Sequence, residues 1–201
     1  NKYVEQKVVK NLNNIKKSPI LSDILKYQDV YVNGVRYANL GSFERFFDIN
    51  HLLEIFSDSP ICDIHGDLTI ENIICDEDSY YLIDPNTGNI LECPYLDLGK
   101  LFQSLHGGYE FLMRVREVSV VENRINFTYM RSSAYDALYQ RLQQYILDAY
   151  DERVLRQVYY HELIHWLRLM PYKLNHLGEK SLIFYAGMLM VLNSISSFDK
   201  E

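Results

Sequence analysis

The first 28 residues carry apolar side chains at helical spacing among polar neighbours. The repeating positions are Val4, Val8, Leu12 and Ile15. This period predicts helix over residues 1–28. Ser18 followed by Pro19 has the pattern of an N-cap and a first-turn proline, so a short second helix is expected within this stretch, ending at Leu25.

Two later segments have the alternation and the turn residues of β-hairpins. Residues 30–38 alternate about Asn33 and Gly34, and residues 117–129 alternate about positions 122–124. Asn and Gly tolerate the left-handed backbone that a two-residue hairpin turn requires, so both segments are predicted to be hairpins. Three shorter runs of strand type lie between them, at 61–64, 73–75 and 80–83.

Helical periodicity covers most of the remaining chain. Ser42 is placed to cap a helix that carries a cluster of phenylalanines. Another helix is expected from Tyr95 to a break at Gly107-Gly108. Three more are predicted at residues 133–149, 151–169 and 179–196, with interruptions at Pro171 and Gly178. The pattern therefore predicts one α+β domain that is mostly helical, with a small β region between residues 61 and 94.

Composition and charge narrow the functional classes. The chain has 201 residues, of which 48% are hydrophobic and 23% are charged, as in an ordinary globular protein. A net charge of −7 without a basic block argues against nucleic acid and against an anionic membrane surface as partners. No apolar run reaches the roughly 18 residues of a membrane helix. Three cysteines without CxxC spacing argue against a disulfide framework, so a cytoplasmic location is expected.

The most informative polar residues lie among the short strand-like runs. His65, Asp67 and Asn72 fall within residues 61–75, and Asp84 ends the run at 80–83. Carboxylates in apolar runs that are expected to be buried need a partner or a metal. An amide and a carboxylate at the ends of neighbouring strands form an oxygen-rich site that suits Mg²⁺ and phosphate. With Asn72 and Asp84 as ligands, Asp67 is left to accept or orient the proton of an attacking hydroxyl.

A simpler interpretation is that these are loop-capping residues of an ordinary hairpin. For any one of them that explanation is the better one. The set is harder to explain in this way, because His-Gly-Asp with Asn five residues later is expected by chance on the order of once in a thousand chains of this composition.

This segment resembles the C-terminal lobe of aminoglycoside phosphotransferase-like kinases, a group that includes choline and fructosamine kinases and shares the protein-kinase fold. The resemblance is carried by His65-Gly66-Asp67-Leu68 through Asn72-Ile73, by Ile83-Asp84-Pro85, and by Asp97-Leu98-Gly99-Lys100-Leu101. It covers residues 61–101, about a fifth of the chain, and the helical remainder is compatible with such a lobe.

The resemblance implies a role for each matching residue. Asp67 matches the catalytic-loop aspartate that engages the acceptor hydroxyl, and His65 matches the residue that helps to hold this loop. Asn72 and Asp84 match the two ligands of the metal that binds with the nucleotide. Asp97 matches a buried aspartate that ties down the loop by hydrogen bonds. The implied cofactors are Mg²⁺ and ATP or GTP, and the implied reaction is phosphotransfer to a hydroxyl of a small molecule such as a sugar or an aminoglycoside.

The same resemblance implies a domain organisation. Residues 1–201 are expected to form a kinase-like C-terminal lobe, with a catalytic and metal-binding core at 61–101 and a helical subdomain at 130–201. The sequence has no GxGxxG motif, and residues 1–60 resemble the helices that follow the hinge in such kinases. An N-terminal lobe is therefore expected to be missing from this chain. The expected partners are this segment, a nucleotide and a small-molecule acceptor, and the chain alone is expected to be a weak or inactive kinase.

A second motif indicates different chemistry. His161, Glu162 and His165 form HExxH on a predicted helix, where both histidines share one face and could bind Zn²⁺ with Glu162 as general base. The alternative function is thus a zinc metallopeptidase, with His176 or Glu179 as the third ligand. This motif arises by chance in about one per cent of such chains, and a partly buried structural stripe explains it as well. A non-catalytic pseudokinase module is a further alternative.

Overall fold

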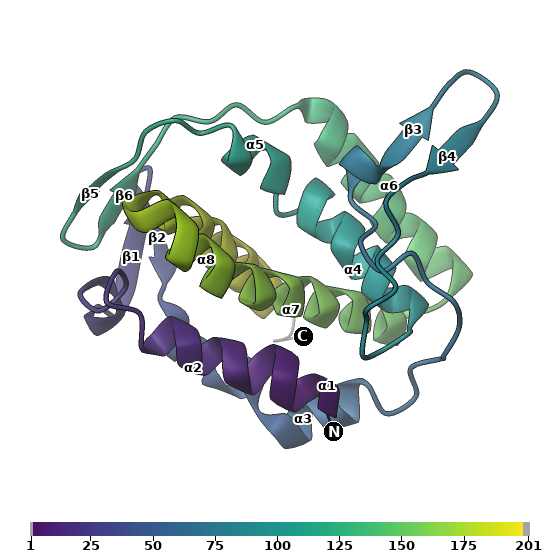
Figure 1. The fold of residues 1–201 in the computed structure, drawn as a ribbon, viewed down its shortest axis with the longest axis horizontal. Coiled ribbons are helices and arrows are strands. Elements are labelled where there is room, and N and C mark those ends of the chain that lie inside the picture. The colour runs from purple at the N-terminus through teal and green to yellow at the C-terminus, as the bar shows by residue number, and fades with distance from the viewer. Residues whose placement is uncertain (1, 199–201) are drawn as a thin grey trace.

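The computed structural model describes residues 2–198 of the chain (Figure 1). It is an α+β structure, 59% helical with small sheets, which confirms the mostly helical α+β prediction. The N-terminal helix is built from α1 (Lys2–Val4), a π-helical segment (Glu5–Val9) and α2 (Lys10–Lys16). The helix predicted from Ser18 does not form, and only a 3₁₀ turn, Ile24–Lys26, follows. The Asn39 side chain donates to the carbonyls of Ile24 and Tyr27, which ends the segment there.

Both predicted hairpins form, and together they make one four-stranded sheet. The first consists of β1 (Asp29–Val32) and β2 (Val35–Ala38), and the second of β5 (Ser119–Val121) and β6 (Arg124–Asn126). Strands β1 and β6 pair in parallel, so the strand order is β2-β1-β6-β5. Asn33 and Glu122 have φ values of 51° and 55°, the left-handed backbone of tight hairpin turns.

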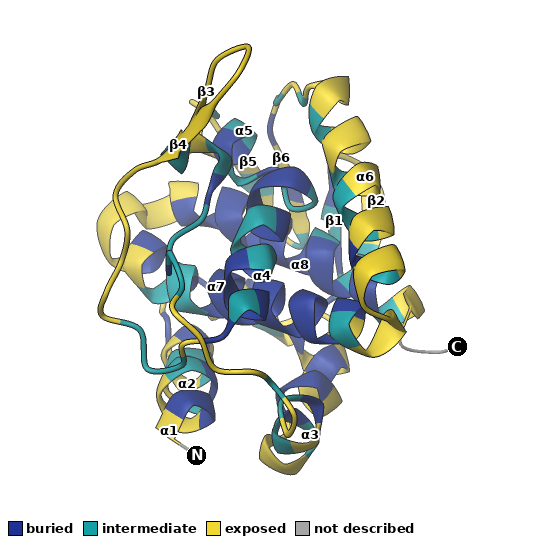
Figure 2. Ribbon diagram, turned by 90° about the vertical axis from the view of Figure 1, so that its right-hand side faces the viewer, coloured by how far each residue is buried: buried dark blue, intermediate teal, exposed yellow. Residues whose placement is uncertain are grey.

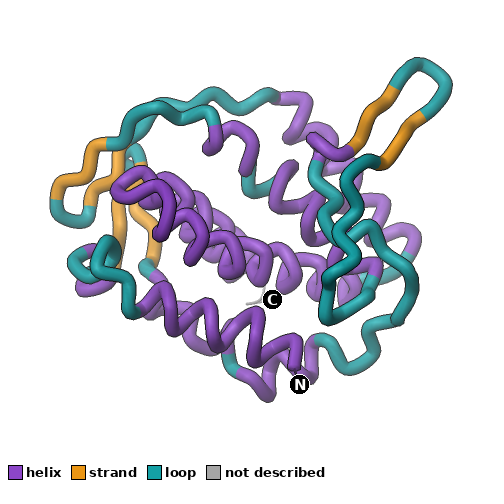
Figure 3. The backbone as a smooth tube through the Cα atoms, in the orientation of Figure 1, coloured by secondary structure: helices purple, strands orange, loops and turns teal. Residues whose placement is uncertain are grey.

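A third hairpin stands apart from this sheet. It consists of β3 (Ile73–Cys75) and β4 (Tyr80–Leu82), and it projects from the body of the molecule (Figures 1 and 3). The strand predicted at residues 61–64 is wrong, because that segment is an extended loop with no neighbouring strand. A single backbone bond from Cys62 to Glu92 holds the loop, and Ile61 is 80% exposed.

The phenylalanine-rich segment forms two short helices in place of one. A 3₁₀ helix spans Leu40–Phe47, and α3 spans Ile49–Ile55. Ser42 is not the cap that was predicted. Asn39 caps the first helix by accepting a hydrogen bond from the Leu40 amide, and Asp48 caps the second by accepting one from the His51 amide. Two separate caps explain why the segment divides at Asp48.

Helices form the body of the molecule and enclose its core. They are α4 (Pro94–Leu105), α5 (Tyr109–Met113), α6 (Ser133–Ala149), α7 (Glu152–Leu177) and α8 (Ser181–Phe198). Helix α6 has the predicted bounds, whereas α7 continues through Pro171, where a break was predicted. Helices α4 and α7 approach so closely that a Cβ on Gly99 would lie 2.6 Å from the Cβ of His161. Helix α7 also packs against α2, α6 and α8, and these contacts outweigh the cost of its internal proline, Pro171.

The stretch that contains α7 and α8 is as apolar as some membrane-spanning helices. The stretch Glu152–Phe198 contains an 18-residue window that is long and apolar enough to cross a membrane, but 67% of that window is buried inside the protein. The core helices of a soluble protein have the same composition. The expectation of no membrane partner therefore stays a prediction.

Candidate phosphotransfer site

The loop that carries Asp67 is attached to helix α4 through one carboxylate. The two side-chain oxygens of Asp97 accept hydrogen bonds from the backbone amides of His65 and Gly66, each at 2.7 Å. Asp97 is only 9% exposed. Burial raises the pKa of its carboxyl group, although the two amide hydrogen bonds act in the opposite direction. The first turn of α4 therefore fixes the backbone that leads directly into Asp67.

Gly66 lets this loop turn sharply against a second loop. Its φ is 81°, and a Cβ at this position would lie 2.3 Å from the carbonyl oxygen of Asn86. The Asn86 amide donates to the carbonyl of His65 at 2.8 Å, which joins the two loops. Only glycine fits here, because both the backbone conformation and the close approach exclude a side chain.

Three hydrogen bonds bring the candidate metal ligands together. The Asn72 side-chain amide donates to the Asp67 carbonyl at 2.8 Å. The Ile83 amide donates to the Asn72 carbonyl at 3.1 Å, and Nε2 of His65 lies 2.8 Å from the Ile83 carbonyl oxygen. Ile83 is thereby held on both sides, and Asp84 follows it directly in the chain. These contacts join the backbone segments that carry Asp67, Asn72 and Asp84.

Asp84 adopts an unusual backbone conformation for its position. Its φ is 54°, although it is not glycine and it precedes Pro85, a context that favours extended backbone. Such strain costs energy and is found most often at functional sites. Within residues 2–198 the Asp84 side chain has no hydrogen bond or ion pair, so its carboxylate is available to a ligand.

Lys100 is a site residue that the motif analysis did not assign. Its Nζ lies 3.1 Å from Oδ1 of Asp67, and the two side chains are 17% and 44% exposed respectively. Lys100 follows Asp97 by one turn of α4, so the two side chains project from the same face of the helix. The spacing from Asp97 was the available signal, but it did not show which carboxylate Lys100 would reach. The charge of Asp67 is thereby paired while the group stays open to solvent.

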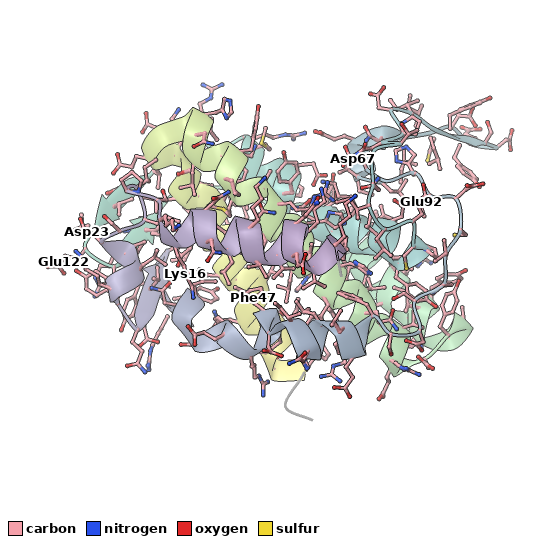
Figure 4. All side chains as sticks on the ribbon, turned by 60° about the horizontal axis from the view of Figure 1, so that its bottom comes forward. Lys16, Asp23, Phe47, Asp67, Glu92 and Glu122 are labelled. Carbon is pink, nitrogen blue, oxygen red and sulfur yellow. The ribbon has the colours of Figure 1, made fainter. Side chains whose placement is uncertain are left out.

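A second contact ties the loop to α4 about two turns further along the helix. Oγ of Ser104 accepts a hydrogen bond from the Ile70 amide at 3.3 Å and donates to Glu110 Oε1 at 2.5 Å. Glu110 is buried, and this burial raises the pKa of its carboxyl group. Asp97 and Ser104 therefore hold the loop on both sides of Asp67. Figure 4 shows Asp67 at the loop end of the molecule, far from Asp23 and Glu122.

One premise of the sequence argument is wrong. The apolar runs beside the site were expected to be buried, yet β3 and β4 are largely exposed (Figure 2). The exposed apolar side chains here are Ile61, Ile74, Tyr80, Tyr81, Leu82 and Ile83. Asp84 is exposed as well, so the cost of burying a carboxylate applies to Asp97 and not to the metal-ligand candidates. Cys62 and Cys75 are also exposed, and all three cysteines are free, as expected for a chain without a disulfide framework.

The donor set at Asn72 and Asp84 fits magnesium. It offers one amide oxygen and one carboxylate, both hard oxygen donors, and Mg²⁺ commonly takes few protein ligands together with phosphate and water. The Asn72 amide nitrogen is already engaged by the Asp67 carbonyl, which leaves its oxygen for coordination. The described residues contain no group of three or more His, Cys, Asp and Glu side chains that could hold a metal, so these two ligands would act with the phosphates.

The HExxH residues have other partners. Nδ1 of His161 lies 3.1 Å from the Tyr3 hydroxyl, and Nε2 of His165 lies 3.0 Å from the Leu96 carbonyl oxygen. Both histidines are buried, and burial lowers the pKa of each, that of His161 to about 3. The suggested third ligands, His176 and Glu179, are exposed, away from this buried pair. The zinc interpretation thus finds no third ligand among residues 2–198.

Comparison with known proteins adds no relative. No family model, no curated protein and no solved structure matches the chain. The likeness to kinases therefore depends on the residues and contacts described above.

Proposed function

We propose that this chain is the catalytic lobe of a small-molecule kinase that transfers the γ-phosphoryl group of ATP or GTP to a hydroxyl. The pair of hydrogen bonds that the His65 and Gly66 amides donate to the Asp97 carboxylate is the observation that carries this proposal. It organises a loop whose half-exposed carboxylate, Asp67, is accessible to an acceptor. In phosphoryl transfer the protein mainly positions reactants and neutralises charge, which is what such a loop can do.

Asp67 is the group that would engage the acceptor. A carboxylate within hydrogen-bond reach of the hydroxyl orients its lone pair toward phosphorus and accepts its proton as the new bond forms. Lys100 would stabilise the charge that develops on the transferring group, since its ammonium already lies 3.1 Å from the same carboxylate. Asn72 and Asp84 would hold Mg²⁺. When it is bound, Mg²⁺ neutralises charge on the nucleotide phosphates.

The exposed hairpin supports a further part of the proposal. Tyr80 and Tyr81 are 70% and 62% exposed, which is unusual for aromatic side chains on a strand. The apolar surface of β3 and β4 borders the site, and a covering segment would shield the reaction from water. An N-terminal lobe is the proposed covering segment, and it would supply the rest of the nucleotide site.

Substitution of Asp67 tests the reaction. In the full-length protein, with labelled ATP or GTP and a panel of sugars, amino sugars and amino alcohols, Asp67→Asn should lower kcat at least about 100-fold because the proton acceptor is lost. The melting temperature should stay near that of the wild type. Asp78→Asn is the matched control, because this exposed aspartate lies at the tip of the β3–β4 hairpin. Near-normal turnover in Asp67→Asn would remove Asp67 from its role.

Substitution of Asp84 tests the metal site. Asp84→Asn should raise the Mg²⁺ concentration needed for half-maximal activity, because one charged ligand becomes neutral. Broadening of amide NMR signals near Asn72 by Mn²⁺ with nucleotide should weaken in the same variant. Nucleotide binding without any transfer would favour a pseudokinase. One tightly bound Zn²⁺ that is lost on His161→Ala would favour the peptidase.

A further inference from the structure

A second group of reactive side chains lies around His106, which follows α4. Nδ1 of His106 is 2.8 Å from Oε2 of Glu162 on α7, and Nε2 is 3.1 Å from Oγ of Ser194 on α8. Glu162 is fully buried, while the His106 side chain is 12% exposed and Ser194 is half-buried. Three helices thus converge to align serine, histidine and glutamate in that order. None of these residues belongs to the loop around Asp67.

The contacts select one tautomer of the imidazole. A buried carboxylate can only accept, so Nδ1 of His106 carries the hydrogen that is donated to Glu162. In the neutral ring Nε2 is then the acceptor, and the Ser194 hydroxyl donates to it. The Tyr139 ring stacks on the imidazole with centroids 4.8 Å apart and planes 14° apart, which fixes its orientation. This is the arrangement in which histidine can take a proton from serine.

The serine and the histidine both line one cavity. Its volume is about 860 Å³, large enough for a small organic molecule. Met190 and Val191 supply apolar surface beside Ser194. Arg131 also lines the cavity, but its guanidinium is paired with Asp136 at 2.8 Å and donates to the carbonyls of Leu105 and His106. Its charge is therefore already balanced, and the apolar wall is the surface that would receive the acyl group of a substrate.

Packing alone gives an incomplete explanation of this group. Oε1 of Glu162 is buried without a partner, and leaving such an atom unpaired destabilises the folded state. A leucine or glutamine at this position would avoid a buried charge. Retaining a carboxylate at that cost is more easily understood if it orients and stabilises a histidine that becomes charged during a reaction.

We propose that Ser194, His106 and Glu162 form a second reactive site, of the serine-hydrolase type, for short-chain carboxylic esters. Ser194 Oγ forms a bond to the ester carbonyl carbon while its proton moves to Nε2 of His106. The ester C–O bond then breaks, and the leaving alcohol takes that proton. Water attacks the acyl carbon, gives its proton to Nε2, and the carbon–Oγ bond breaks as Ser194 regains the proton. The net reaction is ester plus water to acid plus alcohol.

Covalent labelling and ester hydrolysis test the assignment together. A fluorophosphonate probe should add to Ser194, detected by mass spectrometry of the peptide that contains it, and p-nitrophenyl acetate and butyrate should be hydrolysed. Ser194→Ala should abolish the adduct and lower hydrolysis at least about 100-fold. Ser196→Ala is the matched control on the same helix and should retain both signals. The Ser196 hydroxyl donates to the Asn193 carbonyl at 2.9 Å.

Two further variants keep the result independent of folding and of the phosphotransfer proposal. Glu162→Gln preserves the volume of the side chain and should slow hydrolysis even if Ser194 is still present. Asp67→Asn should leave the hydrolysis unchanged, because its site is separate. No adduct on Ser194, or equal hydrolysis by wild type and Ser194→Ala, would overturn the proposal.

Discussion

The α4–α7–α8 core and the β3–β4 hairpin have similar apolar composition but opposite environments. Trp166 on α7 is completely buried, whereas Tyr81 on β4 is 62% exposed. Helix α7 packs against both α4 and α8, while in the described part of the chain β3 and β4 pair with each other and with no further strand. An apolar segment therefore has surface that can be buried, but it is buried only where a second element packs against it. The candidate site lies between these regions, with Asp97 on the buried side and Asp84 on the exposed side.

The largest difference in stability is expected between alanine variants of a buried and an exposed aromatic residue. Trp166→Ala should lower the free energy of unfolding by about 3–5 kcal/mol, because it opens a cavity in the core beside Gly187. Tyr81→Ala should change it by no more than about 0.5 kcal/mol, because the exposed ring has few contacts to lose. Urea denaturation of both variants gives the comparison. Equal losses would mean that the hairpin is covered in solution.

The next effect is expected at the boundary between the two regions. Asp97→Asn should lower the free energy of unfolding by about 2 kcal/mol, because an amide NH₂ would face one of the two backbone N–H donors. Hydrogen exchange at the His65 and Gly66 amides should become faster. Asp63→Asn, which changes an exposed aspartate near the same loop, is the control and should leave both measurements unchanged.

The remaining effect concerns the pH dependence of the stability of the core. Burial lowers the pKa of His161 to about 3 and also lowers that of His165. The unfolded chain binds protons at both residues near pH 6.5, and the native state does not. The free energy of unfolding should therefore fall as the pH drops below 6.5, by about 1.4 kcal/mol per pH unit for each histidine.

Paired variants isolate this histidine contribution. The raised pKa values of Asp97 and Glu110 act in the opposite direction, because these carboxyl groups bind protons more readily in the native state. Comparing melting temperatures of wild type and His161→Phe between pH 7 and pH 5 removes this background. His161→Phe should reduce the slope, and His176→Phe, at an exposed position, should not. An unchanged slope in His161→Phe would contradict the buried neutral histidine.

Local signals predicted much of the secondary structure. Helix α6 has the expected bounds, and the hairpin turn at Asn33 has the left-handed backbone that its residues indicated. The second hairpin has left-handed backbone at Glu122, which its residue type did not indicate. Predictions failed where distant residues intervene. Residues 61–64 have strand-forming residues but no strand to pair with, and α7 passes through Pro171 because its neighbours hold it.

For the candidate site, the residues could be predicted from the sequence, but their contacts with distant residues could not. The residues of the candidate site were identified from their order in the chain, since Asp67, Asn72 and Asp84 lie within one short segment. The partners of these residues were not predictable, because Lys100 reaches Asp67 only through the packing of α4. The same holds for His106 and Ser194, which are 88 residues apart.

The amino-acid order by itself determined the periods of the helices, the turns of the hairpins and the set of polar residues near position 67, because these depend on neighbours a few residues apart. Only the tertiary structure decided which carboxylate is buried and which is open, and it turned the glutamate of HExxH toward His106. Burial and ion pairing depend on contacts between distant segments, and such contacts exist only once the chain has packed.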